Sequence, residues 1–169
     1  MKILVTLDGS HFSEAILGTV GKLARSMHAQ VQLLSIAQFE QARSTAVRQT
    51  ATDLAPVSTA TGTMLKVPLP ADLMSPAAES RSQALARVDA SLREYLEDRS
   101  AELKDGDVTV SVEFADDVAE AIIEHARREQ VDLIAMATHG RTGLSHLLAG
   151  SVCERVIRSG VAPVLVLRP

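Results

Sequence analysis

Aromatic residues are nearly absent from this sequence: they make up 2% of it, with no tryptophan, one tyrosine and three phenylalanines. The core of the folded chain must therefore be built from aliphatic side chains such as valine, leucine, isoleucine, alanine and methionine. Proteins that bind single-stranded nucleic acid commonly stack bases on aromatic side chains, so this composition argues against that class of function.

The sequence also lacks an excess of positive charge. Its formal net charge is −4 at pH 7, and its 17 lysine and arginine residues form no basic run. Binding of duplex nucleic acid depends largely on neutralising phosphates with such residues, so no nucleic acid partner is expected.

Cysteine and long apolar runs are scarce as well. The one cysteine, Cys153, excludes a disulfide within the chain and is typical of a reducing compartment. No apolar run approaches the ~20 residues that a membrane-spanning helix needs. The opening Met-Lys leads directly into a strand-like segment instead of a signal peptide. We therefore expect a soluble, cytoplasmic protein with no membrane partner.

What the sequence does contain is a regular alternation of strand-like and helix-like segments. Its 169 residues, 46% of them apolar, suffice for one domain over residues 1–169 with a sizeable core. The strand-like segments are Lys2–Leu7, Val31–Ile36, Val108–Phe114, Val131–Met136 and Ala162–Leu167. The helix-like segments follow Ser10, begin at Ser75-Pro76, follow Asp117 and run from Ser151 to about Ser159. This alternation predicts an α/β fold with a parallel sheet covered on both faces.

Local signals mark the ends of these segments. Ser10 and Asp117 stand where helix N-caps are expected, and Gly160 stands where a left-handed residue would end a helix. Val108–Phe114 alternates strictly between apolar and polar residues, which indicates a strand at a sheet edge. The helix after Ser10 is predicted to bury one apolar stripe, made of Ile16, Val20, Leu23, Ala24 and Met27.

Residues from about 38 to 74 interrupt the pattern. They are rich in alanine, threonine, serine, glutamine and proline and show no sustained period. We interpret them as a long insertion, either with a role of its own or as a mobile segment. Met64–Pro70 is locally apolar, but its prolines exclude a central strand, so we expect it on the surface, over a partner or over a ligand site.

The most informative stretch runs from Met136 to Val152, between a predicted strand and a predicted helix. It contains Gly140, Gly143 and Gly150. Glycine lets the backbone come close to a ligand, and the first amides of a helix attract negative charge. The chain has no G-x-x-x-x-G-K-[ST] and no G-x-G-x-x-G after its first strand. By spacing alone, a phosphate site and a simple turn are equally good interpretations of this loop.

The residues of this stretch resemble the nucleotide motif of the universal stress protein family, which is Gly, two residues, Gly, nine residues, Gly, then Ser or Thr. Here the motif would be Ala137-Thr-His-Gly140, nine residues, and Gly150-Ser151. The resemblance continues at Lys2–Ser10, Asp116–Ile122, Val152–Arg158 and Ala162–Leu167, and so covers nearly the whole chain outside the insertion. It implies a Rossmann-like open sheet of five parallel strands in the order 3-2-1-4-5, and an ATP site at the carboxyl ends of strands one and four.

The resemblance also assigns roles to individual positions. Thr6, Leu7 and Asp8 would line the adenosine end of the site, and the backbone of Ile36 would meet adenine. Met136 and Ala137 would flank the ribose. The phosphates would be held by Gly140, Arg141, Gly150, Ser151 and Val152, with His139 and Gly143 nearby. The chain departs from the motif at Ala137, where the family has its first glycine, and the added methyl group could crowd the ribose. The implied ligand is ATP, with AMP or ADP as alternatives, together with Mg²⁺.

Several of these residues have more than one interpretation. Asp8 can accept a hydrogen bond from the ligand, help to hold Mg²⁺ against phosphates, or cap the following helix. Arg141 can pair with phosphate or remain in solvent. Cys153, in the first turn of a helix, can have a lowered pKa or simply pack in the core. His139 and His146 have no nucleophile and orienting residue with them, and the other histidines are scattered, so neither an enzyme nor a metal site is predicted.

The last strand-like segment supports a prediction of assembly. In the family's strand order Ala162–Leu167 lies at a sheet edge, and its apolar sequence is a hazard that proteins usually cover. The resemblance implies a homodimer through this segment. Two functions remain open: a nucleotide-binding regulatory module of the stress response, or a dimeric interaction protein whose nucleotide site is vestigial. A third possibility, an enzyme of the wider adenine-binding α/β group, would need a substrate domain for which this chain has no room.

Overall fold

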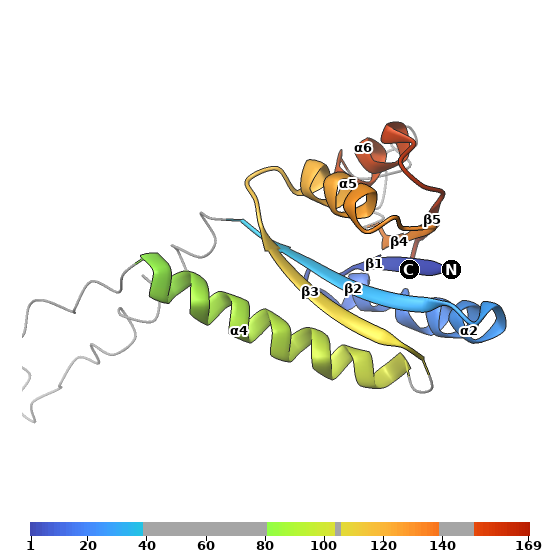
Figure 1. Ribbon diagram of the computed structural model, residues 1–169, viewed down its shortest axis with the longest axis horizontal. Helices are drawn as coiled ribbons and strands as arrows, with labels where there is room; N and C mark the ends of the chain where they lie inside the picture. The colour runs from blue at the N-terminus through green and yellow to red at the C-terminus, as the bar shows by residue number, and fades with distance from the viewer. Residues whose placement is uncertain (39–80, 104–105, 139–150) are drawn as a thin grey trace, which may run out of the picture.

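The protein contains one parallel sheet of five strands. The computed structural model describes residues 1–38, 81–103, 106–138 and 151–169. The strands are β1 (Lys2–Thr6), β2 (Gln30–Ala37), β3 (Val108–Phe114), β4 (Leu133–Ala137) and β5 (Val164–Leu167). They pair in the order β3-β2-β1-β4-β5, and every pairing is parallel (Figure 1). The predicted strand order is confirmed, and so is the edge position predicted for Val108–Phe114.

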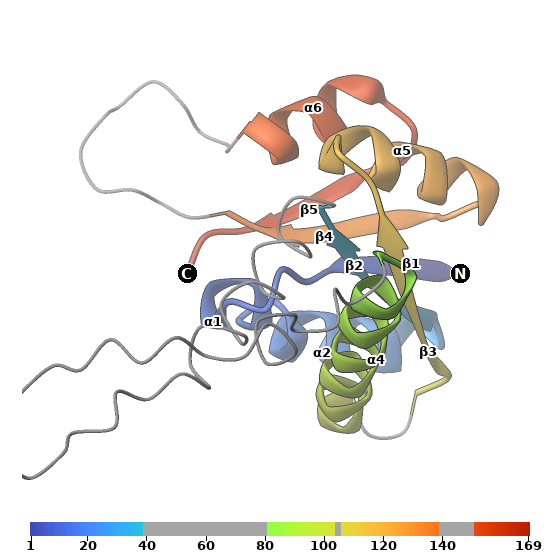
Figure 2. The same cartoon turned by 90° about the vertical axis from the view of Figure 1, so that its left-hand side faces the viewer.

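Helices cover both faces of this sheet, which confirms the predicted layers. Two views show α4 and α2 on one face and α5 and α6 on the other (Figures 1 and 2). The helical segments are α1 (His11–Glu14), α2 (Leu17–Met27), α4 (Arg81–Ser100), the 3-10 turn η2 (Ala101–Leu103), α5 (Val118–Arg128) and α6 (Ser151–Ser159).

Alternating strand residues separate two hydrophobic cores. Val5 and Leu33 face the core that α2 and α4 complete with Leu17, Val20 and Leu96. Their neighbours along the strands, Leu4 and Leu34, face the core that α5 and α6 complete with Ile122, Ile123 and Val156. Side chains of a strand point alternately to its two faces, so a central strand covered on both sides must be apolar at consecutive positions.

The predicted helix ends are largely confirmed. The hydroxyl of Ser10 accepts a hydrogen bond from the Ser13 amide at 3.2 Å, which caps α1. The carboxylate of Asp117 accepts one from the Glu120 amide at 3.1 Å, which caps α5. Gly160, directly after α6, has φ of +62°, the left-handed conformation expected for a helix stop.

The prediction of one continuous helix after Ser10 is wrong. The segment forms the short α1 and then α2, with Ala15 and Ile16 between them. Met27, predicted to complete the buried stripe, is 47% exposed. It occupies the last turn of α2, next to the left-handed residue His28 that ends the helix, while Val20 and Ala24 of the same stripe are buried.

Some predicted features lie outside the described residues. These are nearly all of the 38–74 insertion, the helix start at Ser75-Pro76, and the glycine-bearing loop over 139–150. Within the described ranges, none of the helices is both long and apolar enough to cross a membrane.

Candidate functional site

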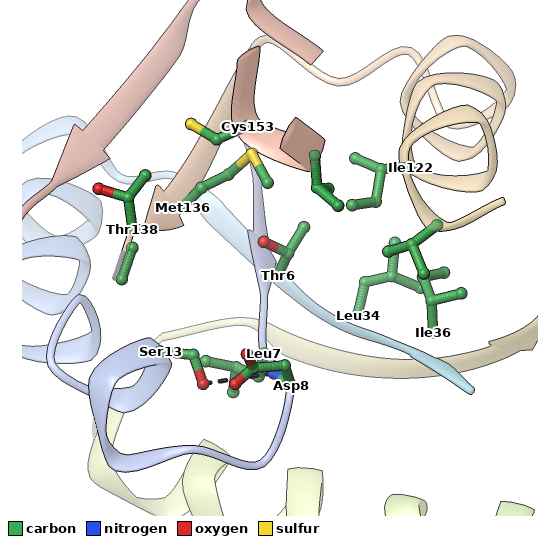
Figure 3. A pocket seen from close by; sticks show the side chains of 13 residues that line it. Thr6, Leu7, Asp8, Ser13, Leu34, Ile36, Ile122, Met136, Thr138 and Cys153 are labelled. Atoms are coloured by element: carbon green, nitrogen blue, oxygen red, sulfur yellow. Dashed lines mark hydrogen bonds between the residues drawn. The ribbon is translucent and has the colours of Figure 1, made fainter. Parts of the chain in front are cut away.

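A pocket of about 270 Å³ lies at the carboxyl ends of β1, β2 and β4. The carboxyl edge of an open parallel sheet is where ligands of such folds bind, because the loops after the strands diverge there. Figure 3 shows the side chains converging from the ends of the strands, from the turn before α1, and from α5 and α6. The lining residues are Thr6, Leu7, Asp8, Ser13, Leu34, Ile36, Val118, Ile122, Met136, Ala137, Thr138, Val152 and Cys153.

One side of the pocket is apolar. Leu34 and Ile36 come from β2, Val118 and Ile122 from the first two turns of α5, and Met136 from β4. They belong to the α5–α6 core or pack against it. An apolar surface of this kind is suited to the faces of a planar, weakly polar ring, which it removes from water.

The opposite side of the pocket is polar and belongs to the turn between β1 and α1. Gly9 has φ of +79°, so the chain turns back through a conformation that glycine adopts without strain. The Asp8 amide donates to the Ser13 hydroxyl at 3.3 Å (Figure 3). That hydroxyl donates to the Ser10 carbonyl at 2.8 Å. Ser13 is 5% exposed, so the turn is closed by hydrogen bonds that are largely protected from water.

Asp8 does not cap α1 itself but hydrogen-bonds to the capping residue, Ser10. Its Oδ1 atom accepts hydrogen bonds from the Ser10 amide at 2.9 Å and from the Ser10 hydroxyl at 2.6 Å. Ser10 in turn caps α1. The capping role considered for Asp8 therefore belongs to Ser10, and the exposed Asp8 carboxylate lies in the wall of the pocket.

Ala137 fits its place in β4 without backbone strain. The non-glycine residues with positive φ in the described chain are His28 and Gln130, so Ala137 does not need the conformation that glycine favours. Its side chain is half-buried and packs against the core on the α2–α4 face, while that of the preceding Met136 belongs to the other core. Ala137 nevertheless is one of the residues that line the pocket.

Cys153 lies in the pocket wall and is 3% exposed. Burial raises the pKa of its thiol, which is opposite to the lowering considered for the first turn of a helix. A protonated, buried thiol is a poor nucleophile, which agrees with the interpretation of Cys153 as a packing residue.

The structure brings together the site residues expected from both ends of the chain. Those that line the one pocket are Thr6, Leu7, Asp8, Ile36, Met136, Ala137 and Val152. Ser151 is the first residue of α6. The remaining expected residues, His139, Gly140, Arg141, Gly143 and Gly150, lie outside the described residues. The contact of any of these residues with a nucleotide stays a prediction.

Sequence reasoning did not select several residues that line the pocket: Ser13, Leu34, Val118, Ile122, Thr138 and Cys153. Leu34 could have been found because it precedes Ile36 by two positions on one strand and so shares its face. Val118 and Ile122 are four residues apart on α5, the spacing that places two side chains on one side of a helix. Ser13 had no local signal, because its role depends on the tight turn that brings its hydroxyl to the Asp8 amide.

The described residues offer no preformed site for a metal ion held by protein alone. No group of three or more histidine, cysteine, aspartate or glutamate side chains in those ranges is arranged to hold one. Among the described residues that line the pocket, Asp8 is the one carboxylate.

Comparisons with known proteins agree on one family. The profile of the Universal stress protein family matches residues 1–168. The chain is 30% identical over 173 residues to the stress response protein NhaX of Bacillus subtilis, and the match covers 99% of this chain and 97% of that protein.

Solved structures support the fold. The structure of the protein MJ0577 has a TM-score of 0.64 at 23% identity and covers 99% of this chain and 95% of that one. The universal stress protein of Archaeoglobus fulgidus, solved in complex with dAMP, has a TM-score of 0.55 at 14% identity, with 98% of this chain and 96% of that chain covered. At such identities the likeness shows a shared fold.

Proposed function

The chain belongs to the universal stress protein family, and from this premise we propose that it binds an adenine nucleotide in the pocket at the carboxyl ends of β1, β2 and β4. The observation that carries the proposal is the division of this pocket into an apolar wall and a hydroxyl- and carboxylate-bearing wall. A nucleoside has the same division, between a flat base and a polar sugar. The dAMP complex of the Archaeoglobus fulgidus relative supports this choice of ligand.

The apolar wall fits the base. Ile36, at the end of β2, and Ile122, on α5, lie toward one side of the pocket, and Met136 lines it next to Cys153 (Figure 3). Aliphatic and thioether side chains can pack against a purine ring, and the sulfur of methionine makes favourable contacts with aromatic rings. As proposed, the backbone of Ile36 would meet adenine, and Thr6, Leu7 and Asp8 would line the adenosine end.

The polar wall fits the sugar. A carboxylate has about four lone-pair sites, so Asp8 can accept from a ribose hydroxyl while it continues to accept from Ser10. Met136 and Ala137 would flank the ribose from β4.

The phosphates would lie toward α6. This helix begins at Ser151, and Val152 in its first turn lines the pocket. The amides of a helix N-terminus favour an anion, so Ser151 and Val152 would hold phosphate together with Gly140, Arg141 and Gly150, with His139 and Gly143 nearby. Mg²⁺ would bind chiefly to the phosphates, with Asp8 as its protein carboxylate.

We further propose that the protein acts as a cytoplasmic regulatory module of the stress response and not as an efficient enzyme. Binding of ATP, or of AMP or ADP, would change its conformation or its partners. The homodimer would form through β5, the strand at one edge of the sheet. All four of its residues are half-buried and apolar, which suits pairing with a second copy.

The test is isothermal titration of the protein with ATP and Mg²⁺, together with the shift in its unfolding temperature. A ligand that prefers the native state must raise its stability, by ~2.7 kcal/mol at 100 times the dissociation constant. Mass spectrometry of freshly purified protein would identify any nucleotide carried through purification.

A pair of variants assigns binding to the pocket. Val118→Phe fills its apolar wall and is expected to abolish binding. The same change at Val161, which precedes β5 at the amino ends of the strands, is expected to leave affinity unchanged. Absence of both heat and thermal shift with ATP, AMP and adenosine would overturn the proposal. It would favour an interaction protein with a vestigial site, which Ala137 and the long insertion support.

A further inference from the structure

The polar wall of the pocket includes α1, a helix too short to be stable by itself. α1 contains four residues, His11–Glu14, and α2 does not continue it directly. Isolated helices shorter than ~12 residues are marginal in water, because few backbone hydrogen bonds offset the cost of ordering the chain. The bonds among Asp8, Ser10 and Ser13 are all local, so they shape the turn but do not fix it to the rest of the protein.

A contact with α4 supplies an anchor from far away in the chain. The Tyr95 hydroxyl donates to Glu14 Oε1 at 3.0 Å, and the two residues are 81 positions apart. Glu14 is the last residue of α1 and follows the pocket residue Ser13 directly. The Tyr95 ring packs against the core on the α2–α4 face, so the donor is itself held by packing.

The Glu14 carboxylate is engaged at both oxygens. Its second oxygen, Oε2, lies 3.1 Å from His11 Nδ1 and 3.9 Å from the Arg99 guanidinium. Arg99 also lies over the Tyr95 ring, 5.9 Å from its centroid, and so binds both members of the pair. The Glu14 side chain is 16% exposed, and hydrogen bonds to a partly buried charge are stronger than those at the surface.

The Tyr95 hydroxyl stays protonated at neutral pH and so remains a hydrogen-bond donor. Burial and the hydrogen bond to the Glu14 carboxylate raise the pKa of Tyr95 to about 12.

We infer that Tyr95 is a positioning residue for the pocket: through Glu14 it fixes α1 to α4, and thereby holds the Asp8–Ser13 turn in the geometry that faces the ligand. The effect on affinity rests on the proposed function, whereas the effect on the turn does not. A ligand that binds to Asp8 and Ser13 is therefore coupled to α4 through the hydrogen bond between Tyr95 and Glu14.

The test compares Tyr95→Phe with Asp89→Asn. The first removes one hydroxyl and keeps the ring under Arg99. The second breaks the Asp89–Arg93 ion pair, 2.6 Å long, which lies within α4. In the ligand-free protein, amide hydrogen exchange measured by NMR is expected to accelerate at Asp8 and Ser13 in Tyr95→Phe and to stay unchanged in Asp89→Asn. Equal exchange at these two amides in both variants would overturn the inference, whatever happens to the unfolding temperature.

Affinity provides the second measurement. Tyr95→Phe is expected to weaken ATP and adenosine binding by the same factor, roughly tenfold, because the turn lines the adenosine end and not the phosphates. In a Glu14→Met background, Tyr95→Phe is expected to cause no further loss of affinity, since the two residues act as one unit. Unchanged affinity in Tyr95→Phe, or additive losses in the double variant, would overturn the inference. If the unaltered protein binds neither ligand, the proposed function fails and the exchange measurement still decides the role of Tyr95.

Discussion

His125 Nδ1 lies 2.6 Å from Glu113 Oε1, and this contact joins α5 to the edge strand β3. His125 is 1% exposed, and a ring nitrogen that faces a carboxylate oxygen at this distance donates its proton to it. The Arg128 guanidinium, one turn further along α5, donates to the same carboxylate oxygen. Glu113 is therefore the acceptor for the Nδ1 proton of a buried histidine, beyond the pocket and independent of any ligand.

Replacing Glu113 with alanine is expected to destabilise the protein by roughly 1–3 kcal/mol, the usual cost of leaving a buried donor unpaired. The donor left behind is His125 Nδ1–H. Urea unfolding of the variant measures the loss. Glu124→Ala, at an exposed position of the same helix, is the control and is expected to change stability little. Equal losses in the two variants would contradict this role for Glu113.

The same contact predicts a dependence of stability on pH. Burial acts to raise the pKa of Glu113, but hydrogen bonds from His125 and Arg128 outweigh it and hold the pKa below the ordinary value of 4.5. A group whose pKa is lowered by folding stabilises the native state above its unfolded pKa, and this contribution is lost as the pH falls through the folded pKa. The free energy of unfolding should therefore fall below about pH 5, and fall less in Glu113→Gln, which keeps an acceptor but does not titrate. Parallel curves for the two proteins would speak against the assignment.

Cys153 is expected to react slowly with iodoacetamide in the folded protein. Its thiol is 3% exposed and its pKa is raised by burial, so reaction requires local opening and deprotonation. Because the chain contains one cysteine, the mass of the labelled protein reports on this site alone. We expect labelling at least roughly tenfold slower in buffer than in urea, and slower still with ATP if the nucleotide occupies the pocket. Comparable rates in buffer and in urea would show that the thiol is accessible.

Ala137→Gly is expected to change affinity and stability in opposite directions. Glycine inside a strand costs roughly 0.5–1 kcal/mol of stability, because it has no side chain to pack and more freedom to lose on folding. Removing the methyl group also enlarges the pocket at the proposed ribose position, so ATP should bind a few-fold more tightly. Ala135→Gly, on the same face of β4 but away from the pocket, is expected to lower stability without a gain in affinity. Weaker binding in Ala137→Gly would mean that the methyl group contacts the ligand favourably.

The edge strand β5 predicts a dimer in solution. Light scattering at micromolar concentration is expected to give twice the chain mass of 18.0 kDa. Leu165→Arg, within β5, should shift the mass to that of one chain, whereas Thr109→Arg, on the opposite edge strand β3, should leave it unchanged. A monomer from the unaltered protein would be enough to reject the prediction.

The features that were predictable from sequence depend on neighbouring residues. Ser10 and Asp117 were identified as caps because a cap needs only an oxygen-bearing side chain and a helix directly after it. The alternation of strands and helices predicted a parallel sheet, but the order of its strands came from the resemblance to a family, since periodicity does not say which strands pair.

The features that were not predictable depend on residues that meet only in three dimensions. Glu113 and His125 each look like an ordinary polar residue in its own segment, and their contact exists because β3 and α5 pack together. Nothing in the sequence near Tyr95 indicates a partner for its hydroxyl, because the acceptor Glu14 lies 81 positions away, on α1. Part of the pocket wall could not be predicted for the same reason: Ser13 and Ile122 lie on different elements, and only the fold makes both of them line the one pocket.

The alternation of side chains along the strands has a consequence at their carboxyl ends. The sheet separates the two hydrophobic cores, but both of them reach the pocket where the strands end. Leu7 and Ala137 belong to the core on the α2–α4 face, and Leu34, Ile122 and Met136 belong to the core on the α5–α6 face. A ligand bound in this pocket would therefore contact side chains of both hydrophobic cores at once, although the sheet separates these cores elsewhere.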